Sequence, residues 1–465
     1  MDPLFTVSQV MEATGGKLAT GSADVSITGV SIDSRTLQPG DVFIAIAGPR
    51  FDGHEFTQAA AQGGAFAMIV SDERREDTCR TLGPDIPIVA VSHTEHALQC
   101  LARWYRERFD IPVVGITGSC GKTTVKDLVV STLGTRYSVA GTRGNLNNEL
   151  GVPLTLFEID SGTEIAVVEM GVNAPGEMDQ LCDIAIPNAG AITSIGEAHL
   201  EGFGSIETLA EEKARLAHRI GENGVLFISA DDVHCRRVAG EFPGTCVRFG
   251  FDRSAEFRVS KVKMDVAEGM SVTVNDTEFN VGIYGRHNAA NVAATVAVSR
   301  HFGLTGDQVQ AGFRGYVPAP MRMEVTQVTG ITVINDTYNA NPDSVRCALE
   351  TLARWTCNGS RIAVLGEMKE LGDFAESAHE EMGRVSARLQ IDQLLVLGEH
   401  AGAVIRGAGS EAGAKVHATA FRTHEQLLET LVNLARRGDV ILVKGSRAAE
   451  MDRVVYSFIK GRTLC

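Results

Sequence analysis

A short glycine-rich segment constrains the fold of this chain more than any other feature. The β-branched run at residues 113–117 leads into Gly118-Ser119-Cys120-Gly121-Lys122-Thr123-Thr124, and VKDLVVSTL follows at helical spacing. A strand, a glycine loop and a helix in this order bring backbone N–H groups to a helix N-terminus, where they converge on phosphate oxygens. The sequence therefore predicts an α/β domain with a nucleotide-binding loop.

The loop departs from the general P-loop, in which two glycines stand five positions apart. Here Gly121 is preceded by Gly118 three positions back and by Gly115 six positions back. Lys122 still supplies a positive charge for the β- and γ-phosphates, and Thr123 supplies a hydroxyl for Mg²⁺. A glycine turn with an incidental lysine is the alternative interpretation, and the flanking strand and helix patterns disfavour it.

The length of 465 residues allows about three domains. In residues 1–108, short β-type runs such as DVFIAIAG alternate with Ala-rich helical stretches, which predicts a small α/β domain. Residues 109–316 carry buried parallel-type strands (VVGIT, IAVVEM, AGAITSI, GVLFISA) and end in a β-rich insert at about residues 245–283, which predicts a doubly wound, mostly parallel sheet. Residues 317–465 again alternate strands and helices, which predicts a Rossmann-like α/β domain.

Charge and cysteine content exclude several classes of protein. The formal net charge of −15 disfavours a nucleic-acid partner. No stretch approaches about 18 apolar residues, and the N-terminal residues lack a basic segment, so we expect no membrane insertion and a cytoplasmic location. The nine cysteines include no CxxC pair, so we expect reduced thiols rather than disulfides or a cysteine-based zinc site.

Three further residues suggest a metal centre next to the glycine loop. Glu169 stands at the end of a buried strand, where a carboxylate is costly unless it meets a cation, and Mg²⁺ is the natural candidate. His199 follows a second strand, and a satisfied loop histidine is its alternative interpretation. Lys213 lies fourteen positions after His199, and a solvated helix lysine is the alternative there.

Several motifs then occur in order along nearly the whole chain. They are GITGSCGKTT, TRGNLNNELGVPLTL, VVEMGVNAPGEM, ITSIGEAHLEGFGSIETLAEEKARL, YNANPDS, LGEMKELG and VKGSRAAEM. Together they resemble the Mur ligases of peptidoglycan synthesis. The resemblance implies an ATP-dependent ligase in which Lys122 and Thr123 hold the ATP phosphates and a first Mg²⁺, with Glu169 also on metal. It implies that His199 binds a second Mg²⁺ and that a carbamylated Lys213 supports that ion, so the catalytic residues would be Lys122, His199 and Lys213.

The resemblance also implies the remaining nucleotide-binding residues. Asn288 and Asn291 share one face of an expected helix, and Asn291 would contact adenine, whereas helix capping is the alternative. Arg322 suits the γ-phosphate, and Asp336 and Tyr338 follow a strand at the position of a ribose or metal-water ligand. The family usually has Gly before this arginine, so Met321 is a departure that we expect to affect the path of the linker.

The resemblance to the Mur ligases also assigns residues to the peptide and uridine parts of the substrates. The candidates for the acceptor carboxylate and its phosphate are Asn145, Asn147 and Asn148. The candidates for substrate binding in the third domain are Asn339, Asn341, Lys444, Ser446 and Arg447. The candidates for a uridine diphosphate in the first domain are Ser34, Arg35, Arg50, Asp52 and Gly53.

Within the family, NLNNELG and YNANPDS favour the dipeptide-adding member. This implies that the partners are UDP-N-acetylmuramoyl-tripeptide and D-alanyl-D-alanine, which would be joined through an acyl phosphate with release of ADP and phosphate. We also expect a monomer. The alternatives are a sister ligase that adds the third amino acid, folylpolyglutamate synthetase, a P-loop ATPase that is not a ligase, and a UDP-sugar binding module.

Overall fold

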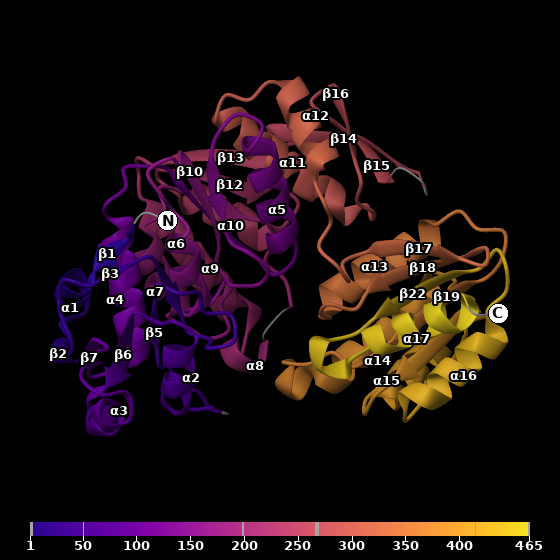
Figure 1. The fold of residues 1–465 in the computed structure, drawn as a ribbon. Coiled ribbons are helices and arrows are strands. Elements are labelled where there is room, and N and C mark those ends of the chain that lie inside the picture. Colours follow the sequence, from indigo (N-terminus) through magenta and orange to yellow (C-terminus); the bar gives the residue numbers. More distant parts are fainter. Residues whose placement is uncertain (1–2, 50, 198–199, 266–268, 414, 464–465) are drawn as a thin grey trace.

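The computed structural model describes residues 3–49, 51–197, 200–265, 269–413 and 415–463, and Figure 1 shows three α/β units in chain order. This confirms the predicted fold class. None of the helices in these ranges combines the length and the apolar content that a bilayer crossing demands.

The first unit is built on a five-stranded sheet of order β2-β7-β6-β5-β4. Its strands are β2 (Lys17–Thr20), β4 (Gly29–Ser31), β5 (Asp41–Ile44), β6 (Ala67–Ser71) and β7 (Ile88–Val91). A separate antiparallel pair is formed by β1 (Phe5–Thr6) and β3 (Ser26–Ile27). The helices are α1 (Val7–Thr14), α2 (Thr57–Gln62), α3 (Arg75–Leu82) and α4 (Thr94–Arg106), with 3₁₀ turns η1 (Gly53–Phe56) and η2 (Asp72–Arg74).

The second unit contains a nine-stranded sheet of order β16-β15-β14-β13-β12-β11-β8-β10-β9. The parallel strands are β8 (Val113–Thr117), β9 (Val139–Gly141), β10 (Ile165–Glu169), β11 (Ala189–Ile192), β12 (Val225–Ser229) and β13 (Thr245–Gly250). The strands β14 (Phe257–Asp265), β15 (Gly269–Val274) and β16 (Thr277–Val281) form an antiparallel meander at one edge. The hairpin predicted in the β-rich insert is therefore confirmed.

Helices cover both faces of this sheet, as expected for a doubly wound fold. Val114 points toward the face packed by α5 (Lys122–Leu133), α11 (His287–His301) and α12 (Gly306–Gly315). Its neighbour Val113 points to the opposite face, because successive side chains of a strand alternate. That second face is packed by α6 (Gly151–Leu156), α7 (Glu177–Ala185), α9 (Ile206–Ile220) and α10 (Val233–Glu241), and α8 (Leu200–Phe203) precedes α9.

The third unit holds a six-stranded sheet of order β17-β18-β22-β19-β20-β21, parallel except for β17. Its strands are β17 (Glu324–Val328), β18 (Ile331–Asp336), β19 (Arg361–Leu365), β20 (Gln393–Leu397), β21 (His417–Phe421) and β22 (Val440–Lys444). One face packs against α13 (Pro342–Arg354), α14 (Ala375–Arg388) and α15 (Ala401–Ser410), and the other against α16 (His424–Leu434) and α17 (Asp452–Thr463). Two 3₁₀ turns are η3 (Gly372–Phe374) and η4 (Arg447–Ala449).

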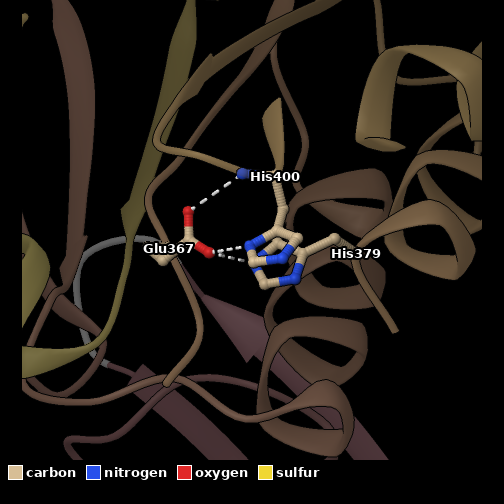
Figure 2. Close-up of side chains that lie close together, drawn as sticks. All are labelled: Glu367, His379 and His400. Atoms are coloured by element: carbon tan, nitrogen blue, oxygen red, sulfur yellow. Dashed lines mark hydrogen bonds and ion pairs between the residues drawn. The ribbon is translucent and has the colours of Figure 1, made fainter. Parts of the chain in front are cut away.

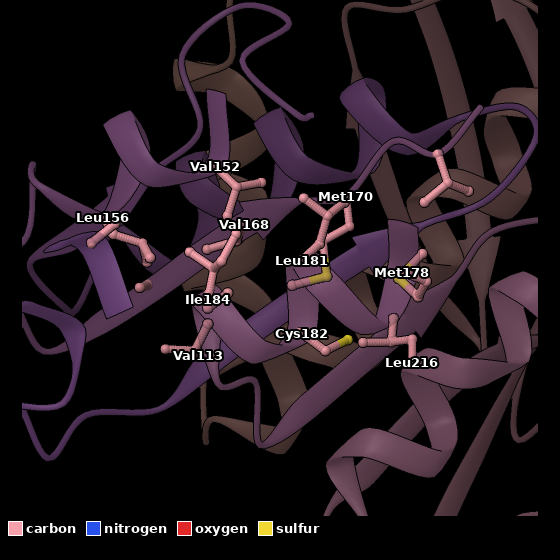
Figure 3. Close-up of a cluster of buried hydrophobic side chains, with 14 of the residues drawn as sticks. Val113, Val152, Leu156, Val168, Met170, Met178, Leu181, Cys182, Ile184 and Leu216 are labelled. Atoms are coloured by element: carbon pink, nitrogen blue, oxygen red, sulfur yellow. The ribbon is translucent and has the colours of Figure 1, made fainter. Parts of the chain in front are cut away.

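The first two units share one continuous hydrophobic core, part of which is drawn in Figure 3. Leu98 and Tyr105 of α4 belong to the same cluster as Leu156 of α6 and Met178 of α7. The third unit has cores of its own on the two faces of its sheet. The first two units are therefore joined through a shared interior, whereas Tyr284 of the second unit packs against the separate core of the third. The boundaries at residues 108 and 316 stay predictions.

Candidate active site between the second and third units

The glycine loop lies between the end of β8 and the start of α5. Gly118 and Gly121 have φ values of 147° and 88°, which side chains rarely adopt. A Cβ atom on Gly121 would lie 2.5 Å from Asn291 Oδ1, and one on Gly118 would lie 2.0 Å from Thr193 Oγ1. Both glycines are required here, because the loop backbone presses against α11 on one side and the end of β11 on the other.

Lys122 folds back over this loop, and its Nζ donates to the carbonyl of Gly118 at 2.7 Å. Burial lowers the pKa of the Lys122 ammonium, while the nearby Glu169 carboxylate opposes this shift. The loop backbone is fixed from outside as well, since Ser194 Oγ accepts from Cys120 N at 3.1 Å. The arrangement presents one amine and a set of fixed N–H groups, which suits an anionic ligand.

Glu169 is a buried carboxylate at the end of β10, as the sequence predicted. Its Oε1 accepts from Thr123 Oγ1 at 3.0 Å and from Asn147 Nδ2 at 2.7 Å. Its Oε2 is buried and has no hydrogen-bond partner among the described residues. A buried, half-satisfied carboxylate beside a hydroxyl is a suitable pair of oxygen ligands for Mg²⁺, so the residues fit that ion.

The third unit faces the glycine loop with two basic side chains. Arg322 Nη2 donates to Thr123 Oγ1 at 3.2 Å, and its guanidinium lies 4.0 Å from the centre of the Tyr338 ring. Lys444 Nζ donates to Asp336 Oδ2 at 2.6 Å and to Asn339 O at 2.9 Å. Positive charge therefore reaches the loop from both units.

A cavity of about 260 Å³ lies between these groups. Most of the residues predicted for the nucleotide and the acceptor carboxylate line it: Ser119, Cys120, Gly121, Lys122, Thr123, Thr124, Asn145, Asn147, Glu169, Asn288, Asn291, Arg322, Asp336, Tyr338, Asn339, Asn341 and Lys444. Asn291 Nδ2 donates to Asn288 Oδ1 at 2.7 Å, so the two amides do share a face of α11.

Several lining residues were not predicted from the sequence, among them Asn173, His287, Tyr316 and Ser344. His287 directly precedes Asn288, so its place next to a predicted ligand was the one signal that could have identified it. Tyr316 lies in the linker between the second and third units, where no sequence periodicity indicates its orientation.

The structure places Lys213 inside the protein, so the solvated-helix alternative is wrong. The residue is 1% exposed on α9, and burial lowers the pKa of its ammonium well below the ordinary value, with Lys122 adding to the shift. The neighbouring Glu212 carboxylate accepts from the backbone of Gly176 and Met178 at the start of α7. His199 lies outside the described residues.

Four of the described residues that were predicted for the nucleotide and the peptide substrates do not line the cavity. Gly118 opens the loop without lining the cavity, and Asn148 Oδ1 instead accepts from Gly151 N at 3.0 Å at the start of α6. Ser446 precedes η4, and Arg447 pairs with Asp452 at 3.6 Å. Their predicted substrate roles stay predictions.

A wider groove, of about 1620 Å³, lies between the first unit and residues 143–161 of the second. Ser34, Arg35 and Gly53, which were predicted to bind a uridine diphosphate, line it. Asp52 does not line it, because this carboxylate pairs with His54 and Arg74, each at 2.6 Å. Arg50 lies outside the described residues. The lining residues that the sequence did not predict include Phe56, Tyr105, Arg108 and Arg143.

Three family models match consecutive parts of the chain. Residues 26–106 match "Mur ligase family, catalytic domain", residues 116–299 match "Mur ligase middle domain", and residues 321–447 match "Mur ligase, glutamate ligase domain".

Individual relatives match over nearly their full length. The UDP-N-acetylmuramoyl-tripeptide--D-alanyl-D-alanine ligase of Bacillus subtilis is 34% identical over 463 residues, which cover 98% of each chain. A MurF crystal structure from Acinetobacter baumannii superposes with a TM-score of 0.88 at 29% identity and 99% coverage of both chains. The MurF ligase of Thermotoga maritima in complex with ADP gives a TM-score of 0.80 at 30% identity, covering 94% of this chain and 98% of the other.

Proposed function

This chain belongs to the Mur ligase family, and we propose that it joins D-alanyl-D-alanine to UDP-N-acetylmuramoyl-tripeptide at the expense of ATP. It is a ligase of peptidoglycan synthesis. The observation that carries the specific substrate pair is the full-length similarity to relatives named for that reaction, together with the two pockets, one for a nucleotide and one for a second large ligand.

The ligation requires two anions to approach each other, because the γ-phosphate must pass to a peptide carboxylate. Lys122, Arg322 and the loop N–H groups offset the charge of the phosphates as they approach. The Thermotoga relative, which was solved with ADP, supports a nucleotide at this position. The terminal carboxylate of the tripeptide attacks the γ-phosphorus, ADP leaves, and an acyl phosphate forms.

The second half of the reaction is attack by the amine of D-alanyl-D-alanine on the acyl carbon. A tetrahedral intermediate forms, the carbon–oxygen bond to phosphate breaks, and the amide is released. Asn145 and Asn147 lie on the cavity wall, where their amides would orient the acyl phosphate. The narrow cavity between the two units would also limit the access of water, which otherwise hydrolyses this intermediate.

We further propose that Thr123 and Glu169 hold one Mg²⁺, and that His199 and a carbamylated Lys213 hold a second. When bound, these ions neutralise phosphate charge and polarise the transferring group. Lys213 supports this proposal because burial favours the neutral amine, the form that reacts with CO₂.

The Lys213 proposal is tested by substitution and rescue. Lys213→Ala should lose turnover by at least about 100-fold, and short carboxylic acids in the buffer should restore part of it. The matched control Lys261→Ala replaces an exposed lysine on β14 and should leave turnover unchanged. Full activity of Lys213→Ala would overturn the assignment.

We propose that the wide groove binds the uridine diphosphate end of the acceptor. Arg35, with its side chain 86% exposed, reaches into it beside Asp33 and Ser34. Arg35→Ala should raise KM for the UDP-linked substrate about tenfold and leave KM for ATP unchanged. Arg75→Ala, on α3 of the same unit, is the control. Equal changes in both KM values would place the uridine site elsewhere.

One assay separates the proposed reaction from its alternatives. Release of ADP and phosphate should require both UDP-N-acetylmuramoyl-tripeptide and D-alanyl-D-alanine, and mass spectrometry should find the extended peptide. Release with neither substrate would indicate an ATPase, and release with a single amino acid in place of the dipeptide would indicate a sister ligase. The diaminopimelate and folylpolyglutamate ligases share the fold at 17–18% identity.

We propose in addition that the protein acts as a monomer in the cytoplasm, where ATP is available. Light scattering coupled to size-exclusion chromatography tests the first part of this proposal, and cell fractionation tests the second.

A further inference from the structure

A short segment between β11 and α8 connects the glycine loop with the third unit. Three successive backbone N–H groups of this segment donate to side chains, each at 3.0 Å: Ile195 N to Asp232, Gly196 N to Ser119 and Glu197 N to Asp343. The first two acceptors belong to the second unit, whereas Asp343 lies in the first turn of α13. The third unit therefore holds one end of the segment.

The peptide group between Gly196 and Glu197 is hydrogen-bonded at both of its ends. Its N–H donates to Asp343 Oδ2, and its carbonyl, Gly196 O, accepts from Ser119 Oγ at 3.0 Å. Ser119 is part of the glycine loop and lines the cavity. A carboxylate that accepts from the N–H polarises the peptide group and makes its carbonyl a stronger acceptor. Asp343 thus acts on the glycine loop through two hydrogen bonds in series.

The approach of Asp343 to this peptide group requires a glycine at position 196. A Cβ atom there would lie 1.9 Å from Asp343 Oδ2, so any side chain would push α13 away. The other oxygen, Asp343 Oδ1, accepts from Arg346 at 3.1 Å, which fixes the orientation of the carboxylate. The Asp343 side chain is 31% exposed, so water screens its bond to Glu197 only in part.

A second polar cluster stiffens the unit that carries this carboxylate (Figure 2). Glu367, after β19, is hydrogen-bonded to His400 at the start of α15. His379 of α14 has both ring nitrogens occupied, since Nδ1 donates to Ala375 O at 2.7 Å and Nε2 accepts from Met368 N at 3.0 Å. The helix α13 packs on the same sheet face as α14 and α15. We therefore expect α13 to move with the third unit as one body.

We propose that Asp343 is a positioning residue for ATP, which acts through the peptide group at residues 196–197 and through Ser119. This inference rests on the proposed function, because it takes ATP as the ligand of the cavity. Asp343 is not among the described residues that line the cavity, so it acts on the loop rather than on the nucleotide. Because it belongs to the third unit, the grip of the loop on the phosphates depends on contact between the second and third units.

The experiment measures the binding of β,γ-methylene-ATP with Mg²⁺ to the full chain by calorimetry, without the other substrates. Asp343→Ala should raise the Kd about tenfold, because it removes a charged acceptor. Asp343→Asn keeps an acceptor oxygen and loses only the charge, so its Kd should rise about threefold. The matched control is Asp307→Ala, which removes an exposed aspartate from the first turn of α12 and should leave the Kd unchanged.

A double variant separates positioning from a purely structural role. Ser119→Ala removes the group through which Asp343 acts, and it should weaken binding by itself. In the Ser119→Ala background, Asp343→Ala should therefore raise the Kd by less than about twofold. A purely structural role of Asp343 would lower the midpoint of thermal unfolding without this dependence on Ser119.

Three results would contradict the role of Asp343. They are an unchanged Kd in Asp343→Ala, a tenfold loss that persists in the Ser119→Ala background, and an equal loss in Asp307→Ala, which would assign the effect to the helix N-terminus. Failure of the proposed function is a separate outcome. An unmodified chain that binds the analogue and forms no extended peptide would refute the ligation, and the binding data would still decide the role of Asp343.

Discussion

The two boundaries between the units differ in their chemistry. Between the first and second units, Phe5, Tyr105 and Phe157 form an aromatic cluster with ring centres 5.5–6.1 Å apart, inside a shared apolar core. Between the second and third units, hydrogen bonds such as the one that Asp343 Oδ2 accepts from Glu197 N at 3.0 Å accompany a ring contact of Tyr284 with Trp355, whose centres lie 5.3 Å apart. The cavity that we propose binds ATP lies at this second boundary.

The difference indicates which boundary can rearrange. Separating the first two units would expose apolar surface at about 25 cal/mol per Å², whereas the polar boundary can exchange its hydrogen bonds for water or substrate at little net cost. We therefore expect reactants to enter and leave between the second and third units, and the first two units to move together.

The largest effect is expected at the polar boundary, on catalysis. Lys122→Ala should lower kcat by about 1,000-fold or more, because it removes a positive charge from beside the transferring phosphate. ADP release with both substrates present measures this, and Lys261→Ala serves as the control. A kcat within tenfold of the unmodified enzyme would contradict the role of the loop.

At the apolar boundary the expected loss is in stability. Phe157→Ala should reduce the free energy of unfolding of the first two units by about 3 kcal/mol, because it leaves a cavity in the shared core. The polar counterpart Asp343→Ala should cost about 1 kcal/mol. Urea unfolding of both variants, followed by far-ultraviolet circular dichroism of the whole chain, measures this. Equal losses would remove the contrast between the boundaries.

A smaller effect is expected from pH at the polar boundary. Burial lowers the pKa of the His287 imidazole to about 4, although Asp336 opposes the shift. The unfolded chain binds this proton first as pH falls below about 6.5, so stability should decrease by about 1 kcal/mol between pH 7.0 and 5.5. Urea unfolding at pH 7.0 and at pH 5.5 should show that the stability of His287→Asn depends less on pH than that of the unmodified chain. An unchanged dependence would exclude this histidine as the cause.

The smallest effect is expected in the linker that crosses the polar boundary. Met321 has a φ of 59°, in the left-handed region that favours glycine. Met321→Gly should stabilise the protein by about 0.5 kcal/mol, since relief of strain exceeds the entropy that glycine adds to the unfolded chain. Met323→Gly is the comparison: its φ is 52°, but its side chain is buried and its loss should destabilise. The midpoint of thermal unfolding should rise in Met321→Gly and fall in Met323→Gly.

Most of the lining of the cavity between the second and third units could be predicted from sequence, whereas in the groove of the first unit only Ser34, Arg35 and Gly53 were predicted. The residues of the cavity follow strand ends in short motifs, and the carboxyl ends of parallel strands meet at one edge of a sheet. The groove combines Arg35, Phe56, Tyr105 and Arg143, which stand in four unrelated segments. Nothing in the local pattern of any one segment indicates that it meets the others.

The sequence by itself determined the order of strands, loops and helices, the glycine loop with its lysine, and the family. Only the tertiary structure decided that Lys213 is buried, that Asp52 serves its own domain rather than the groove, and that Glu367 faces two histidines. The physical reason is the distance along the chain over which each effect acts. Periodicity and glycine conformation depend on a few neighbouring residues, whereas burial and charge pairing depend on which distant segments the packed sheets bring together.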